Sequence, residues 1–261
     1  MHLLILPVLI TLAGASQQLE SPAFLMDHTS YQEPDLSAYV EAGEFDQAIE
    51  ILARYPFTEW TEAHRVNVLE VYNSAVRLSR QTYKAAKERI DALSRHSVGS
   101  RMNEEHLEAL LQDVVWYSNE LLIILNALVR GMPASFWFER ARMIANIADV
   151  HRYLSELPTL SASDHAASAL RAYRDALQMA EPALGPNSLD IFPLGVYNNL
   201  SILLHPTKPV EAVEVLRLAL TKIARARLVN HASITPQIRD LETQMRTCAD
   251  AWHSENEWIV L

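Results

Sequence analysis

The chain has 261 residues, of which 49% are hydrophobic and 8% aromatic, so it is long enough to bury the core of one large helical domain or two small ones. Its formal net charge of -10 argues against general binding to nucleic acid or to an anionic membrane, because both need clustered lysine and arginine. The 6 glycines form no phosphate-cradling loop, and Cys248 has no second cysteine for a disulfide or a thiolate metal cage, so neither a metal site nor a cofactor is predicted.

The chain begins with an apolar run, residues 1–15, about as long as the hydrophobic region of a signal peptide. Ala13, Ala15 and Ser16 would suit cleavage, but no lysine or arginine precedes the run, and it is too short for a membrane span. Secretion, a wrongly assigned start and a simple apolar leader stay open. We expect a cytoplasmic protein without stable membrane insertion, with the secretory pathway as the alternative, and interpret residues 1–33 as this leader followed by a polar linker.

Helical periodicity begins at Asp35 and continues through the rest of the chain. Asp35 is predicted to cap a first helix, which ends before Pro56. A much longer helix is predicted to open at Thr61, because apolar residues then recur at three- and four-residue steps until residues 98–100 (Val-Gly-Ser).

Shorter periodic segments follow, separated by glycine and proline. Helices are predicted over residues 103–130, 135–157, 161–182, 190–205, 209–229 and 236–254. Since no stretch shows sustained strand alternation, the pattern predicts an all-α fold built as an array of antiparallel helices.

One repeat architecture fits part of this array. Residues 169–220 alternate small and large apolar positions in the manner of a tetratricopeptide helical hairpin. A complete array would show self-similarity near 34 residues along much of the chain, and the long helices before residue 157 do not supply it. A tetratricopeptide-like scaffold therefore explains only part of the sequence.

Several separated segments are similar to motifs of the 14-3-3 family and follow the family's order along the chain. They are EFDQAIEI (44–51), RVNVLEVYNSAVRLSRQTYK (65–84), ADVHRYLSE (148–156), LGVYNNLSI (194–202), the Pro-x-x-Ala helix from Pro209, and MRTCADAWHSEN (245–256). Together they cover about residues 36–256, and their combination is much more specific than any one of them. The chain thus resembles a divergent 14-3-3 protein.

The resemblance implies a non-enzymatic domain, residues 34–256, of about nine antiparallel helices in a cup-shaped, tetratricopeptide-related array, with residues 257–261 as a tail. Arg80, Arg152 and Tyr153 fall where the family holds a phosphate, and Asn199 falls where a side-chain amide holds the backbone of the bound peptide. Guanidinium groups donate paired hydrogen bonds to phosphate oxygens, and an amide both donates and accepts, so these residue types suit those roles. Asp149, one turn before Arg152, is expected to pair with an arginine.

The resemblance also assigns Asn73, Ile202, Cys248 and Trp252 to the walls of the groove. Several of these positions depart from the family pattern. Asn73 and Ala145 stand where lysines are usual, Cys248 replaces a second asparagine that holds the peptide backbone, and Asn198 replaces a leucine. Two positive charges are therefore missing, and the affinity for phosphate is expected to be lower than in the family.

The expected partners are phosphorylated client proteins, bound through phosphoserine or phosphothreonine, and a second copy or relative in a homo- or heterodimer through the N-terminal helices. No catalytic constellation accompanies His151 or His165, which are interpreted as surface or packing residues. Two alternatives remain, a phosphate-independent tetratricopeptide-like scaffold and a degenerate family member whose groove no longer binds phosphate.

Overall fold

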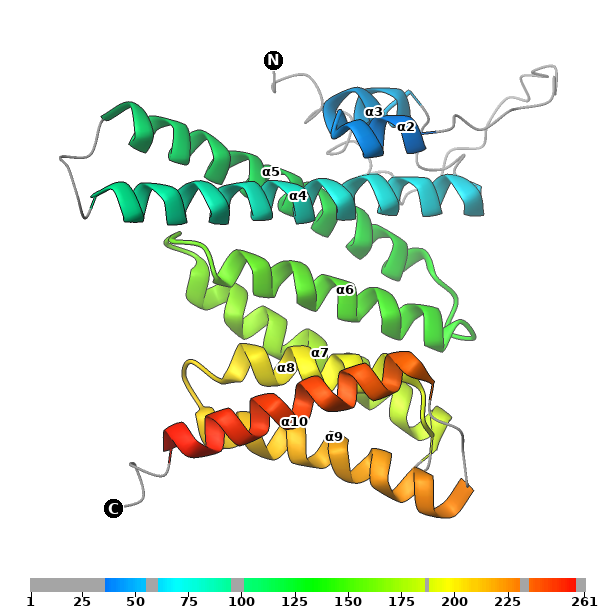
Figure 1. The fold of residues 1–261 in the computed structure, drawn as a ribbon. Helices are drawn as coiled ribbons and strands as arrows, with labels where there is room; N and C mark the ends of the chain where they lie inside the picture. Colours follow the sequence, from blue (N-terminus) through cyan, green and yellow to red (C-terminus); the bar gives the residue numbers. More distant parts are fainter. Residues whose placement is uncertain (1–35, 55–60, 95–100, 186–187, 231–234, 257–261) are drawn as a thin grey trace, which may run out of the picture. The chain divides into compact units, whose positions relative to one another are not determined.

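The computed structural model describes residues 36–54, 61–94, 101–185, 188–230 and 235–256 (Figure 1). All regular elements within these ranges are helices, which confirms the all-α class. The described residues form two compact units, one up to Tyr117 and one from Ser118, and the boundary falls within α5 (Arg101–Gly131). The predicted leader and linker, residues 1–33, and the predicted tail, residues 257–261, lie outside the described residues. Among the described helices, none combines the length and the apolar character that crossing a membrane requires.

The first unit contains α2 (Ser37–Ala42), α3 (Phe45–Leu52) and α4 (Glu62–Ser94). The single helix predicted at the start is wrong, because Gly43 has a φ of 73° and ends α2 in the left-handed conformation, which glycine adopts without steric cost. The N-cap of α2 is Leu36, and the predicted cap Asp35 lies outside the described residues.

The apolar face of α3 packs on α4, as the amphipathic pattern requires. Phe45, Ile49 and Leu52 are all buried. Tyr117 donates a hydrogen bond of 2.9 Å to Asp46, and its ring lies edge-on to that of Phe45 with the centroids 6.2 Å apart. These contacts hold the short helix α3 against the long ones.

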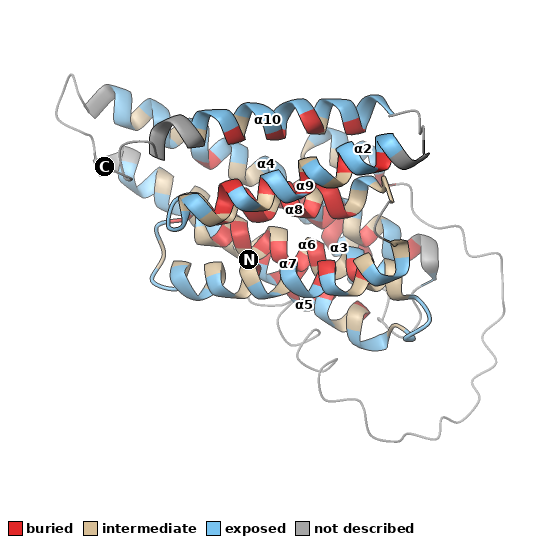
Figure 2. Cartoon of the chain, turned by 90° about the horizontal axis from the view of Figure 1, so that it is seen from below, coloured by how far each residue is buried: buried red, intermediate tan, exposed pale blue. Residues whose placement is uncertain are grey.

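The second unit continues from the end of α5 through five further helices. Their bounds lie within a few residues of the predicted ranges. They are α6 (Trp137–Ser155), α7 (Ala162–Leu184), α8 (Ile191–Leu204), α9 (Pro209–Asn230) and α10 (Pro236–Asn256). Successive helices pack against one another, mostly antiparallel, and α8 also contacts α6 and α10, so the predicted antiparallel packing is confirmed. Figure 2 shows their buried faces turned toward one another.

Alanine brings α6 and α7 into close contact. Buried alanines lie on one face of each helix: Ala141, Ala145 and Ala148 on α6, at four- and three-residue steps, and Ala169, Ala176 and Ala180 on α7, at seven- and four-residue steps. Small side chains let two helix axes approach closely. The alanine face of α6 continues one turn further to Arg152, and that of α7 includes Tyr173, so the fold itself directs a cationic and a phenolic side chain into the α6–α7 interface.

The start of α8 is fixed by a side-chain cap. The Asp190 carboxylate accepts a hydrogen bond of 2.8 Å from the backbone N–H of Phe192, which satisfies one of the free donors of the first turn. Because α8 contacts α6, α7, α9 and α10, most of its side chains are buried. Asn199 is one of its half-buried residues and lies toward α6.

Candidate functional site

Arg152 lies in the last turn of α6 and is only 8% exposed. Its Nε donates a hydrogen bond of 3.1 Å to the Tyr173 hydroxyl, and its Nη1 donates one of 2.9 Å to Glu156 Oε1. Its Nη2 is 3.7 Å from Asp149 Oδ1, so the expected ion pair between Asp149 and an arginine is confirmed. The guanidinium is thereby fixed in position by both α6 and α7.

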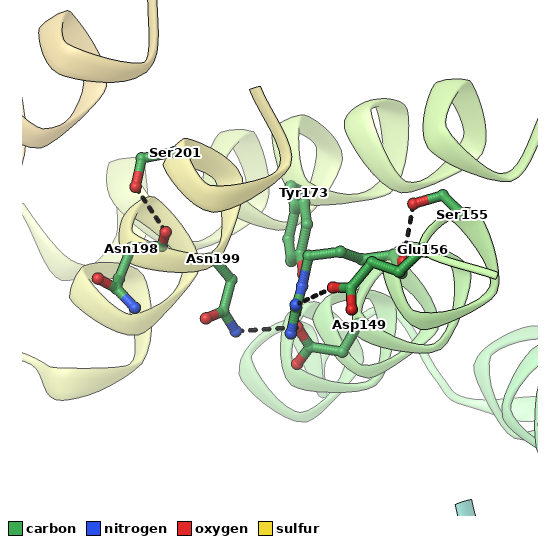
Figure 3. Close-up of polar contacts among 8 residues, drawn as sticks. Asp149, Ser155, Glu156, Tyr173, Asn198, Asn199 and Ser201 are labelled. Carbon is green, nitrogen blue, oxygen red and sulfur yellow. Dashed lines mark hydrogen bonds and ion pairs between the residues drawn. The ribbon is translucent and has the colours of Figure 1, made fainter. Parts of the chain in front are cut away.

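Asp149 is the centre of this cluster. Its Oδ1 accepts a hydrogen bond of 2.5 Å from the Tyr173 hydroxyl and one of 2.8 Å from Asn199 Nδ2. Figure 3 shows Asn199 of α8 and Asp149 of α6 pointing toward one another. One carboxylate therefore connects α6, α7 and α8, and it joins the predicted phosphate-binding arginine to the predicted backbone-binding asparagine. We call Asp149, Arg152, Tyr173 and Asn199 the Asp149 network.

Burial perturbs the titration of this network. It raises the pKa of Asp149, and the hydrogen bond from Tyr173 and the charge of Arg152 partly offset that rise. Burial and the neighbouring Asp149 carboxylate raise the pKa of Tyr173, which keeps its hydroxyl protonated at neutral pH. For Arg152, burial lowers the pKa but the contacts with Tyr173 and Asp149 outweigh it, so the net direction is upward. The tyrosine can thus donate to Asp149 and accept from Arg152 at once.

Three of the four predicted phosphopeptide-binding residues lie together in the second unit. Arg152 and Asn199 share the Asp149 network, and the Arg152 guanidinium carbon is 4.6 Å from the centroid of the half-buried Tyr153 ring. The fourth, Arg80, is a half-buried residue of α4 in the first unit, on the same helix as the exposed Asn73. Arg80 belongs to the first unit and Arg152 to the second, and their convergence stays a prediction.

The other predicted groove residues in the second unit, Ile202, Cys248 and Trp252, are half-buried. Cys248 and Trp252 pack against the hydrophobic core, and Trp252 stacks on the ring of His205, with the centroids 4.1 Å apart and the planes 18° apart. Burial raises the pKa of the Cys248 thiol, so a thiolate nucleophile is disfavoured there.

Asn198, which stands where the family has a leucine, is 6% exposed. Its Oδ1 has no hydrogen-bond partner among the described residues. A buried acceptor without a donor is costly, so nothing in the described residues favours asparagine over leucine here.

The sequence did not identify two residues of the site, Tyr173 and Glu156. Tyr173 reads as one more large residue in the apolar stripe of α7, although a fully buried phenol normally needs a partner for its hydroxyl. Glu156 lies four residues after Arg152, a spacing that places the two side chains on one helix face and could have revealed the pair.

A pocket of about 330 Å³ adjoins Arg152 between the ends of α6, α7 and α8. Its lining is mainly aliphatic, with Glu156, Thr207 and Lys208 exposed at its rim. The residues that form it include Arg152 of α6, Glu156 at the C-cap of α6, Ala166, Ala167 and Leu170 of α7, residues 202–204 of α8 and residues 206–208.

A histidine pair lies elsewhere on the α6–α7 interface. His151 Nδ1 and His165 Nδ1 are 2.9 Å apart, which the sequence did not predict. Burial, followed by the charges of His165 and Arg171, lowers the pKa of His151 to about 4, and burial also lowers the pKa of His165. The pair is therefore mainly neutral at pH 7, and a hydrogen bond between the two Nδ1 atoms requires one ring to carry its proton on Nδ1 and the other on Nε2. The described residues contain no group of three or more side chains placed to hold a metal ion.

Comparison with known proteins gives no match, either to a family model or to a curated sequence. The resemblance to 14-3-3 proteins accordingly depends on the motifs quoted above.

Proposed function

We propose that the chain is a divergent 14-3-3-like adaptor that binds client proteins through phosphoserine or phosphothreonine and sequesters or clamps them, without catalysis. The observation that carries the proposal is the Asp149 network, in which a buried arginine and an asparagine from separate helices are held by one carboxylate. Such preorganisation lowers the entropic cost of binding a charged group.

The chemistry of Arg152 suits a phosphate in one specific way. A phosphoserine carries roughly -1.5 to -2 charges and three acceptor oxygens. Nε and Nη2 of Arg152 face Tyr173 and Asp149 inside the interface, whereas Nη1 is paired with the Glu156 side chain, which is 30% exposed. The phosphate would therefore replace the Glu156 carboxylate on Nη1, with the hydroxyl of Tyr153 as an additional donor.

Asn199 would hold the backbone of the client next to the phosphate. Because its Nδ2 donates to Asp149, its carbonyl oxygen is oriented as an acceptor for a peptide N–H. One network would then fix both the charge and the strand of the client.

The proposal extends to the whole chain. The two units would form the cup-shaped array of the family, with Arg80 completing the phosphate site, and the N-terminal helices would form a homo- or heterodimer in the cytoplasm.

Analytical ultracentrifugation tests the homodimer. A mass that rises from monomer to dimer with concentration is expected, and an unchanged monomer mass would exclude self-association.

Fluorescence anisotropy with matched labelled peptides tests the function. The full chain should bind a phosphoserine peptide and not its serine counterpart. Arg152→Lys should weaken phosphopeptide binding by about tenfold or more, because an ammonium cannot reproduce the fork of hydrogen bonds. Arg217→Ala, an exposed arginine of α9, is the matched control and should bind as the wild type does.

Equal affinity for the two peptides would contradict the proposal. A folded chain that binds both would instead be a phosphate-independent helical scaffold, and one that binds neither across a panel of family-type peptides would have a degenerate groove.

A further inference from the structure

The pocket beside Arg152 is built to hold an aliphatic group. Ala166 and Ala167 of α7 leave the space, and Leu170 and Ile202 supply the apolar walls. Its volume of about 330 Å³ lies at the lower end of the range for small-ligand pockets. A side chain or short chain segment fits this size.

The rim of the pocket offers a cation, Lys208, to a ligand. Lys208 lies on the rim with its side chain 54% exposed, and it pairs with Glu211, 34% exposed, over 3.2 Å. An exposed pair of this kind contributes little to stability, so Lys208 can turn toward another acid at low cost. Glu156 also lies on the rim and is paired with Arg152 in the free chain, and a phosphate on Nη1 would displace it from Arg152. Lys208 is therefore the rim residue with which an acidic residue of the client would pair.

The pocket is continuous with the candidate site. Arg152 belongs to both, and Ile202 lies three residues after Asn199, on the same face of α8. A chain segment held at Arg152 and Asn199 would therefore pass the mouth of the pocket within a few residues.

We propose that this pocket is a specificity site for an aliphatic side chain of the bound client, from a leucine, isoleucine, valine or methionine a few residues from the phosphorylated one, with an acidic neighbour paired to Lys208. This inference rests on the proposed phosphopeptide function. It assigns to the chain a client class in which phosphorylation is accompanied by an aliphatic and an acidic residue.

A leucine walk tests the proposal. Phosphoserine peptides with an alanine background carry one leucine, moved in turn through the positions on either side of the phosphoserine, and their affinity for the full chain is measured by anisotropy. Leucine at one or two positions should tighten binding by about tenfold, as expected for partial burial of its side chain. An aspartate beside that leucine should tighten peptide binding further. Lys208→Glu should reverse this effect of the aspartate, so that the aspartate weakens binding.

Ala166→Leu fills the pocket and should abolish the leucine preference while leaving the all-alanine phosphopeptide bound as before. Ile202→Ala provides a second variant that removes a wall without filling the space, and it should reduce the preference. Ser163→Leu, an exposed position in the first turn of α7, is the matched control and should leave the preference intact. Thermal unfolding identifies the variants that are folded.

The outcomes separate the two proposals. The pocket assignment is overturned if the all-alanine phosphopeptide binds and leucine tightens binding at no position. It is also overturned if a folded Ala166→Leu variant keeps the leucine preference. In both cases the phosphopeptide function stands. If no phosphopeptide binds, both fall. Binding of leucine peptides irrespective of phosphate would leave an apolar peptide site and remove the phosphate-dependent function.

Discussion

Tyr173 connects the two charged residues of the Asp149 network. It is fully buried, and its hydroxyl donates to Asp149 and accepts from Arg152 Nε. Tyr173→Phe removes both hydrogen bonds and leaves the buried Arg152 and the half-buried Asp149 with one partner fewer each. We expect it to lower the free energy of unfolding by about 1–3 kcal/mol and to weaken phosphopeptide binding, as measured by denaturant titration and anisotropy.

Tyr197→Phe is the matched control. It also removes a hydroxyl that bonds to a carboxylate, that of Glu181, outside the Asp149 network. It should lower stability and leave phosphopeptide affinity unchanged. If both variants lose affinity equally, Tyr173 has no specific positioning role.

A substitution at Glu156 is expected to strengthen phosphopeptide binding, whereas Tyr173→Phe is expected to weaken it. Because its carboxylate occupies Nη1 of Arg152, it competes with a phosphate for the same donor. Glu156→Gln removes the competing charge and should tighten binding of the phosphoserine peptide severalfold, with no gain for the serine peptide. Glu214→Gln, an exposed acid of α9, changes the net charge equally and should not reproduce the gain. Weaker binding by Glu156→Gln would place the phosphate elsewhere.

At the scale of elements, the histidine pair makes the α6–α7 interface sensitive to acid. His151 has a pKa of about 4 in the fold against an ordinary value of 6.5, so the folded state binds fewer protons than the unfolded state between these values. Its contribution to stability is therefore complete above about pH 6.5 and is lost as the pH falls toward 4. The groups that perturb the pair, His165, Arg171 and Asp164, are all on α7.

The carboxyl groups also make the free energy of unfolding depend on pH. Comparing this dependence between wild type and His151→Gln separates the effect of the histidine pair from theirs. The wild type should lose free energy of unfolding more steeply than the variant between pH 7 and 4, as measured by urea titration at each pH. His106→Gln, an exposed histidine of α5, should follow the wild type. Parallel profiles for wild type and His151→Gln would show that the pair does not affect stability.

The helices of the second unit were predictable because glycine and proline bound each periodic segment, as at Pro209 and Pro236. The division of the predicted first helix into α2 and α3 could not be predicted, because the apolar periodicity continues across Gly43. Only the positive φ of Gly43 separates the two helices. Within the site, the motif located Arg152, Tyr153 and Asn199. The role of Tyr173 was hidden, because a hydrogen bond between two helices depends on their packing and leaves no local spacing in the sequence.

For the molecule as a whole, the proposed phosphate site needs a contribution from the first unit. Asn73 is exposed on α4, two turns before Arg80, where the family has a lysine. If α4 faces the Asp149 network as proposed, Asn73→Lys restores a charge to the site and should tighten phosphopeptide binding by about tenfold. Thr82→Lys, also exposed but on the opposite face of α4, adds the same charge and should have little effect. Equal effects of the two lysines would indicate general electrostatic attraction only.

A crystal structure of the chain with a bound phosphoserine peptide tests the central claim most directly. The phosphate is expected against the guanidinium groups of Arg80 and Arg152 and the Tyr153 hydroxyl, with Asn199 bonded to the peptide backbone. A phosphate bound away from Arg152, or an Arg80 on a face that does not approach it, would refute the proposed function.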